Sequence, residues 1–357
     1  MPPLPTLFAM PKRTVLQWSL RVKPSTRTVW LRLPPASSIL RASKHKATSL
    51  PPRRQARFCK HFFPFKGENM LWSEILSGKF EEARAKACDT CVMVVGCVEQ
   101  HGHHLPLGQD VIHTAAIVEE AAKLEPVVIF PHMYFGEKQG AGEFPGTIIF
   151  STRLMLDILK ESCLEMARNG FKKIILVNGH GGNTNLLQSF ARSVLYEKKD
   201  YMVFVYSSWC AWPRVPQMLK IIDSGNKKAF PELLPEDIEY LRYYVKNNKN
   251  RGHGCLMETS MTLGCRPDLV DLSRIDEVDG CATGRLSHLS RAGFYSPFEW
   301  MADYPDSLAS DAHGGMNERI GKCFFNYTVK KTAEAFRLLK NDTLCEEYRQ
   351  EWAAKQK

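Results

Sequence analysis

The chain has 357 residues, of which 44% are hydrophobic, and a formal net charge of +10. Its length and apolar content suffice for one large domain or two small ones with a sizeable core. Residues 1–69 hold 14 Lys and Arg but one acidic residue, so the remainder has 34 basic and 37 acidic residues. A mildly acidic body gives no reason to expect nucleic acid as a partner. The chain also lacks a run apolar and long enough to cross a membrane.

Residues 1–69 also carry 10 of the 21 prolines. Their poor periodicity predicts a disordered, basic, Pro-rich tail. An organelle transit peptide is an alternative, although prolines interrupt the amphipathic helix that it needs. A further alternative is that translation starts at Met70. A nucleic-acid role for this tail remains a weak idea.

The eleven cysteines are an odd number without a regular framework. The N-terminus has no apolar core of a secretory signal, so we expect free thiols and a cytoplasmic location, with organelle import if residues 1–69 are real. Cys88 and Cys91 form a CxxC motif, but no second pair follows at zinc-ribbon spacing. We interpret them as buried small residues rather than as a redox or zinc site.

From Leu71 onward the pattern is that of an α/β domain, placed at residues 70–345. Short apolar runs typical of buried strands alternate with helical patterns. The expected strands are residues 92–98, 127–130, 173–178 and 201–206, and the expected helices are residues 111–123, 152–169, 184–197 and 328–341. The alternation predicts a three-layer α/β fold with a parallel sheet covered on both faces. A polar helical segment at about residues 213–250 is expected to be an insertion or lid.

Side chains of metal-ligand type follow the first expected strand. Glu99 and His101 are two residues apart, and on an extended backbone such side chains point to the same side. Asp110 precedes a helix, where its carboxylate can bridge two cations or simply cap the helix. The neighbouring His103 and His104 are expected to be solvated loop residues.

A second set follows the strand at residues 173–178. His180 lies in the segment NGHGGN, whose glycines permit tight turns and close backbone approach. This turn could instead bind an anion at a helix N-terminus. Sites in parallel sheets gather beyond the carboxyl ends of the strands, where both sets fall. Nitrogen and oxygen ligands suit Zn²⁺, Mn²⁺ or Fe²⁺, so the sequence predicts a catalytic metal centre and a hydrolase.

Three segments, EQHGHHLPLGQD, NGHGGN and GHGCLMETS, resemble the creatininase (creatinine amidohydrolase) family. Residues 144–147, FPGT, support the resemblance, which covers about residues 70–325. It implies a creatininase-like fold, two divalent metal ions, and a homo-oligomer that is often a hexamer. It also implies hydrolysis of a C–N bond in a cyclic amide or formamide, a small-molecule substrate. A few relatives open other rings.

The resemblance assigns roles to individual residues. Glu99 and His180 would bind one metal ion, His101 would bind the other, and Asp110 would bridge both. A water or hydroxide between the ions would attack the carbonyl carbon.

The third segment supplies the remaining expected roles. His253 matches a proton-transferring histidine, and Glu258, five residues later, would act as a ligand or a base. Trp209 and Trp212 follow the fourth strand and could stack on a flat substrate or pack in the core.

Two departures from the family argue against creatinine as the substrate. Creatininase has a glutamate two residues after the histidine that matches His180, whereas this chain has Gly182. Many relatives also carry a histidine shortly before the position of Phe144. Two alternatives therefore stay open: hydrolytic ring opening of a cyclic keto-compound at a C–C bond, and a non-catalytic metal-binding relative.

Overall fold

The computed structural model describes residues 70–356, except for residues 139, 248–252, 279–281 and 306–314. The expected tail at residues 1–69, with its transit-peptide and start-site interpretations, lies outside the described residues. Among the helices that are described, none is both long and apolar enough to span a membrane.

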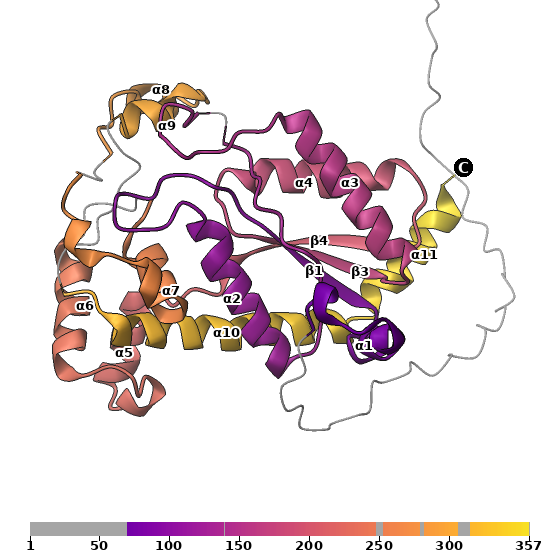
Figure 1. The fold of residues 1–357 in the computed structure, drawn as a ribbon, viewed down its shortest axis with the longest axis horizontal. Coiled ribbons are helices and arrows are strands. Elements are labelled where there is room, and N and C mark those ends of the chain that lie inside the picture. The colour runs from indigo at the N-terminus through magenta and orange to yellow at the C-terminus, as the bar shows by residue number, and fades with distance from the viewer. Residues whose placement is uncertain (1–69, 139, 248–252, 279–281, 306–314, 357) are drawn as a thin grey trace, which may run out of the picture. The chain divides into compact units, whose positions relative to one another are not determined.

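A parallel sheet of four strands forms the middle layer, in the order β2-β1-β3-β4 (Figure 1). The strands are β1 (Thr90–Val95), β2 (Val128–Ile129), β3 (Lys173–Asn178) and β4 (Met202–Ser207). All four lie where the apolar runs predict them, although β1 ends three residues earlier than expected and β2 has two residues. The chain order places a topological switch between β1 and β3, and ligand sites of open α/β sheets lie at such points.

The two central strands are buried on both faces. Val92 and Val94 of β1 belong to one hydrophobic cluster, whereas Cys91, Met93 and Val95 belong to another. Successive side chains of a strand point to opposite faces, so a continuous apolar run supplies both cores. This explains why the short runs predict a sheet covered on both sides.

Helices cover the two faces of this sheet. On one face lie α2, α7 and α10, and on the other lie α3 and α4 (Figure 1). The helices are α1 (Phe80–Lys86), α2 (Gln109–Leu124), α3 (Thr152–Arg168), α4 (Asn183–Ser193), α5 (Val215–Asp223), α6 (Pro235–Asn247), α7 (Leu256–Cys265), α8 (Ser287–Arg291), α9 (Phe298–Asp303), α10 (Glu318–Asn341) and α11 (Leu344–Lys355). The three-layer α/β prediction is confirmed, but the last expected helix begins ten residues earlier, at Glu318.

Both ends of α10 have side-chain caps. At its start, the Asn317 side chain accepts hydrogen bonds from two backbone N–H groups of the first turn, which stabilises a helix N-terminus. At its end, the Lys173 ammonium donates to the carbonyls of Leu339, Lys340 and Asp342. A cation is favourable at this negative end of a helix. The first residue of β3 therefore fixes the end of α10.

The segment expected to be an insertion or lid contains α5 and α6. Leu233 and Leu241 are fully buried in the same hydrophobic cluster as α10. The buried Asp237 carboxylate accepts hydrogen bonds from Arg319 and Asn317 at the start of α10. These contacts pack the segment into the helical layer on that face of the sheet.

The packing of α7 on α10 depends on two glycines. A Cβ atom at Gly264 would lie 2.5 Å from the carbonyl oxygen of Gly321, and one at Gly321 would lie 2.8 Å from the Gly264 nitrogen. The backbones of the two helices therefore approach each other closely. This contact fixes the position of α7, which carries Glu258 in its first turn.

Candidate metal centre

Glycines form the floor of the site at the carboxyl ends of β1 and β3. A Cβ atom would lie 2.6 Å from Val111 if built at Gly96, 2.3 Å from the Gly96 oxygen if built at Gly136, and 2.5 Å from the Asp110 oxygen if built at Gly179. Side chains at these positions would push the segments apart. The glycines thus let the loops after β1, β2 and β3 and the start of α2 meet in one place.

Asparagine side chains tie these segments together. Asn183 donates to the Gly96 carbonyl at 3.1 Å and accepts from the Glu137 N–H at 2.7 Å. The Asn178 side chain accepts from the His180 N–H at 3.0 Å. The NGHGGN turn is therefore held by its own asparagines, with α4 starting at Asn183.

Glu99 and His101 lie in a loop and not on the extended end of a strand, because β1 already ends at Val95. The expectation that strand alternation aligns them is therefore wrong. Their loop is closed by the Glu99 N–H, which donates to the Leu107 carbonyl at 2.9 Å, and it turns at Gly102, whose φ is +68°. Glycine adopts this left-handed conformation without steric cost.

The Asp110 carboxylate stands between the two histidines. Its Oδ1 atom lies 3.0 Å from His101 Nε2, and its Oδ2 atom lies 2.9 Å from His180 Nδ1. Asp110 is the second residue of α2, and the N-cap is Gly108, so the helix-cap alternative is wrong. His180 Nδ1 also lies 3.0 Å from Glu99 Oε1. The structure thus brings these four predicted residues together.

Both histidines are oriented by backbone carbonyls. His101 Nδ1 lies 3.2 Å from the Glu99 carbonyl oxygen, and His180 Nε2 lies 3.2 Å from that of Glu137. When one ring nitrogen donates to a carbonyl, the other is left with a lone pair. In metal sites this arrangement fixes the imidazole that binds the ion.

The two residues of the third segment also reach the cluster. Glu258 Oε2 lies 3.9 Å from His101 Nε2 and accepts from the Gly254 N–H at 2.5 Å. His253 Nε2 donates to the Gln100 carbonyl at 2.7 Å and lies 3.8 Å from Glu99 Oε1. All six predicted site residues are therefore neighbours.

The carboxylates at the centre attract positive charge. Burial alone would raise the pKa values of Glu99 and Asp110, but the neighbouring histidines hold both pKa values below their ordinary range. Burial opposes protonation of the imidazoles too, yet Asp110 raises the pKa of His101 to about 9, and Glu99 with Asp110 raises that of His180 to about 10. Without metal ions, protons supply the positive charge that this cluster favours.

Divalent ions fit this set of ligands. Three groups of possible ligand atoms each lie within 4.8 Å of one another among the described residues: Cys97, Glu99, Asp110 and His180; His101, Asp110 and Glu258; and Glu99, His101 and His253. The ligand atoms of a tetrahedral zinc ion lie about 3.3 Å apart, close to the distances above. The Glu99 oxygens and His101 Nε2 are buried and make no hydrogen bond of good geometry, although His180, Lys138 and Asp110 lie within 3.0 Å of them.

Sequence reasoning missed three residues of the site. Cys97 donates to Asp110 Oδ2 at 3.2 Å, and burial raises its pKa, so the thiol stays protonated. Lys138 Nζ lies 2.5 Å from Glu99 Oε2 and 5.1 Å from the centre of the Trp300 ring. Lys138 and Trp300 stand in no motif with ligand spacing, whereas Cys97 lies two residues before Glu99, a spacing that could have revealed it.

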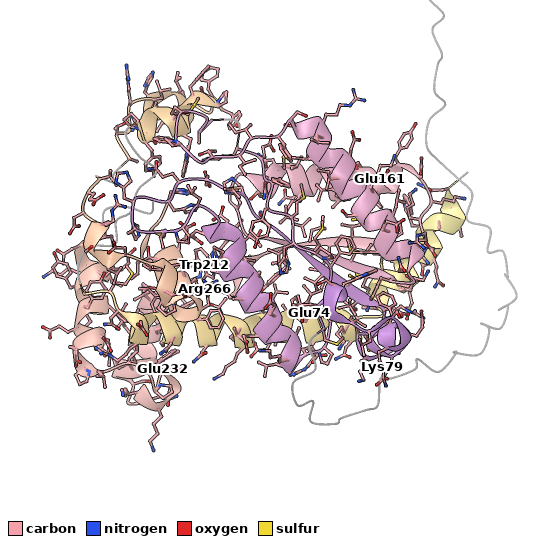
Figure 2. The ribbon with its side chains drawn as sticks, viewed as in Figure 1. Glu74, Lys79, Glu161, Trp212, Glu232 and Arg266 are labelled. Carbon is pink, nitrogen blue, oxygen red and sulfur yellow. The ribbon has the colours of Figure 1, made fainter. Side chains whose placement is uncertain are left out.

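Other expectations for nearby side chains had mixed outcomes. His103 is exposed beside Glu277, as expected. His104 is buried and lies 2.9 Å from the Thr259 hydroxyl, so its expected solvation is wrong. Trp212, labelled in Figure 2, packs against the core cluster and His113, which agrees with the packing alternative. None of the nine described cysteines, Cys88 and Cys91 among them, forms a disulfide.

A parallel α/β sheet with a buried cluster of histidines and carboxylates at its carboxyl edge is typical of metal-dependent hydrolases. The chain belongs to the creatininase family, because the family model described as creatinine amidohydrolase matches residues 73–336. Members of this family are metal-dependent amidohydrolases, and the chain is an enzyme of this class.

Relatives of known name agree with this family. Creatinine amidohydrolase of Pseudomonas putida is 31% identical over 212 residues, which are 56% of this chain and 74% of that protein. The mycofactocin precursor peptide peptidase of Mycolicibacterium smegmatis is 35% identical over 30% of this chain and 45% of its own length. The 3-dehydro-scyllo-inosose hydrolase of Thermotoga maritima is 32% identical over 31% of this chain and 36% of its own.

Solved structures show the same fold. A putative creatinine amidohydrolase from Bacteroides fragilis has a TM-score of 0.59 and 21% identity, and the match covers 78% of this chain and 99% of that one. A creatininase structure described as the Mn form has a TM-score of 0.56 and 23% identity over 77% of this chain and all of its own. The creatininase-like fold expected from the sequence motifs is confirmed.

Proposed function

We propose that this enzyme binds two divalent metal ions and hydrolyses a C–N bond in a cyclic amide or formamide. The observation that carries the proposal is the placement of Asp110, whose two carboxylate oxygens face different histidines at 3.0 and 2.9 Å. A carboxylate so placed suits a bridge between two ions. Solved creatininases described as Mn and Zn-Zn forms favour manganese or zinc.

The first ion would be held by Glu99, Asp110 and His180. His180 Nδ1 lies 3.0 Å from Glu99 Oε1 and 2.9 Å from Asp110 Oδ2. The second would be held by His101, Asp110 and Glu258. Two ions bound in this way would activate a water for attack on a carbonyl carbon and polarise that carbonyl. The carbonyls that hold the two imidazoles keep their ligand nitrogens aimed at this point.

In our proposal, Glu258 supplies the carboxylate ligand that creatininase has at the position of Gly182. A Cβ atom at Gly182 would lie 2.5 Å from His180 Nε2 and 2.6 Å from the Glu137 oxygen, so the glutamate that creatininase has there does not fit this turn. Burial raises the pKa of Glu258 to about 7, although the His101 charge opposes this shift. A bound cation would keep this carboxyl ionised and stable in its buried place.

His253 would carry the proton to the leaving group. Its ring is neutral, because burial and the nearby charge of His101 lower its pKa to about 3. The Nε2–H group is held by the Gln100 carbonyl and lies near Glu99 Oε1. A neutral imidazole beside the reacting groups can accept a proton and pass it on.

Ring opening of a cyclic keto-compound is the second candidate. The similarity to 3-dehydro-scyllo-inosose hydrolase favours it, because the same activated water would attack a ketone carbon. A screen of cyclic amides, formamides and cyclic keto-compounds separates the two reactions. The homo-oligomer that the resemblance implies stays a prediction.

Metal analysis of purified variants tests the proposal. We expect D110A to lose both ions and H180A to lose at least one, with loss of activity and an unchanged far-ultraviolet circular dichroism spectrum. D268N is the matched control, because Asp268 is an exposed acid paired with Arg266, and it should keep its metal. Full metal occupancy in both site variants would refute the ligand assignment.

A further inference from the structure

Lys138 places a buried positive charge next to the proposed metal ligands. It lies in the loop between β2 and α3, and its side chain is 7% exposed. Its ammonium lies 2.5 Å from Glu99 Oε2, the only carboxylate oxygen within 4 Å of it among the described residues. The proposed mechanism uses Glu99 Oε1, which faces His180, and leaves Lys138 without a role.

The position of Lys138 is held from a second side by an aromatic ring. The Trp300 ring of α9 lies 5.1 Å from the ammonium, within the range of a cation–π contact. The same ring packs edge-on against His253, with centroids 5.7 Å apart. Lys138, Trp300 and His253 thus form one continuous wall of the site, which we call the lysine wall.

Lys138 and His253 of the lysine wall keep a small solvent exposure, unlike the centre of the cluster. The side chains of Glu99 and His101 are fully buried, whereas those of His180, His253 and Lys138 are each 7% exposed, and Glu258 is 18% exposed. Solvent therefore touches the cluster at these side chains, Lys138 among them. A substrate that enters past Lys138 would meet its ammonium.

The charge balance makes this ammonium available to a second anion. A buried ammonium needs a partner, because its desolvation is costly. Glu99 is that partner. A divalent ion bound to the same carboxylate would neutralise part of its charge and so weaken its attraction for Lys138. Lys138 also has three N–H donors, more than one carboxylate oxygen can accept. An added anion within reach is then stabilised strongly, since solvent screens little at this depth.

We propose that Lys138 recognises an anionic group of the substrate, a carboxylate or a phosphate, a few atoms from the carbonyl carbon that is attacked. This inference rests on the proposed function and narrows its substrate class to amides or keto-compounds that carry a negative charge. Trp300 is expected to hold the ammonium in place and to contact the substrate between its two polar ends.

Hydroxamates are suitable probes, because their head group binds divalent metal ions whatever the rest of the molecule contains. Butanohydroxamate has a neutral tail, N-hydroxysuccinamate has a carboxylate tail of similar length, and the corresponding phosphonate gives the third arm. Their dissociation constants for the metal-loaded full-length protein are measured by titration calorimetry. The ratio of neutral to anionic Kd within one variant reports on the tail alone.

In the wild type we expect an anionic tail to bind roughly 10–100-fold more tightly than the neutral one, as for a hydrogen bond to a charged group. The anionic tail with the lower Kd shows whether the substrate carries a carboxylate or a phosphate. K138M should abolish the preference, and K138R should keep part of it. K160M is the control, because Lys160 is an exposed lysine on α3, and it should behave as the wild type.

The outcomes separate this inference from the proposed function. Metal content is measured for each variant, since K138M also removes a neighbour of Glu99. Equal binding of neutral and anionic hydroxamates by the metal-loaded wild type would overturn the inference and leave the metal centre intact. An unchanged preference in K138M would overturn it as well. A wild-type protein that binds neither metal nor any hydroxamate would overturn both proposals.

Discussion

The imidazole rings of His101 and His253 are stacked, with centroids 3.7 Å apart and planes at 26°. This contact joins the loop after β1 to the segment just before α7. The proposed ligand His101 therefore lies face to face with the proposed proton carrier. The stack keeps the two rings in contact, so an ion bound at His101 would lie close to His253.

The substitution H253N tests this relationship. We expect it to keep bound metal and to lower kcat by about 10²–10⁴-fold, the usual contribution of a general acid or base. H288N serves as its control, because His288 is exposed on α8, and it should leave kcat unchanged. Steady-state kinetics with the best substrate of the screen, together with metal analysis, gives the result. A wild-type kcat in H253N would exclude the proton-carrier role.

Two adjacent glycines give a stability test of the second segment. In G182A the new methyl group would meet His180 Nε2 and the Glu137 oxygen, whereas nothing lies within 4 Å of the methyl group in G181A. We expect G182A to lower the free energy of unfolding by about 1–3 kcal/mol and to weaken metal binding, and G181A to change it by less than about 0.5 kcal/mol. Chemical denaturation measures both values. Equal stability of the two variants would contradict the crowded turn.

Substitutions of Trp300 and Trp212 distinguish a residue that contacts the substrate from one that packs in the core. W300A removes part of the lysine wall, and we expect KM to rise about 10-fold while the melting temperature changes little, because Trp300 is 40% exposed. W212A removes a ring from the core cluster and should destabilise the protein by about 3 kcal/mol with little change in KM. Thermal unfolding and kinetics on both variants decide between the roles. A raised KM with unchanged stability in W212A would instead support contact between Trp212 and the substrate.

Buried neutral histidines predict loss of stability in acid. Burial lowers the pKa values of His104 and His113 to about 4, from an ordinary value of 6.5. Between these values the unfolded chain binds protons that the folded protein does not, so stability falls as pH decreases from 6.5 towards 4. We expect each histidine to contribute about 1–3 kcal/mol to this loss.

The variant H104Q checks this pH dependence, since glutamine can still bond to Thr259 but does not titrate in this range. The free energy of unfolding of the metal-free protein is measured at several pH values between 4 and 7. The slope should be smaller in H104Q than in the wild type. Parallel curves would show that His104 does not take part.

The sheet and its two covered faces follow from the sequence because β1 and β3 are fully buried. An apolar run such as KIILVN is typical of a strand that is buried on both faces of a parallel sheet. The first helix after β1 is equally well marked. In contrast, the apolar run VGCV predicts that β1 continues to residue 98, but the strand ends at Val95 and Gly96 packs against α2.

The residues that surround the metal-ligand cluster have no local sequence pattern that predicts their positions. His104 is buried only because Thr259 of α7 reaches it from 155 positions away. Lys138 lies in a loop without periodicity, and Trp300 belongs to a six-residue helix. Their roles depend on tertiary contacts, which spacing along the chain does not encode. Residues within one motif are predictable, whereas residues that meet across loops are not.

The glycine floor beneath Glu99, Asp110 and His180 has an evolutionary consequence. Gly96, Gly136 and Gly179 are fixed by backbone contact, so drift at these positions would move every ligand at once. Trp300 comes from α9, a separate segment that makes none of these glycine contacts, whereas Lys138 lies two residues after Gly136 in the same loop. A change of reactant can therefore arise through α9 while the positions of the metal ligands persist.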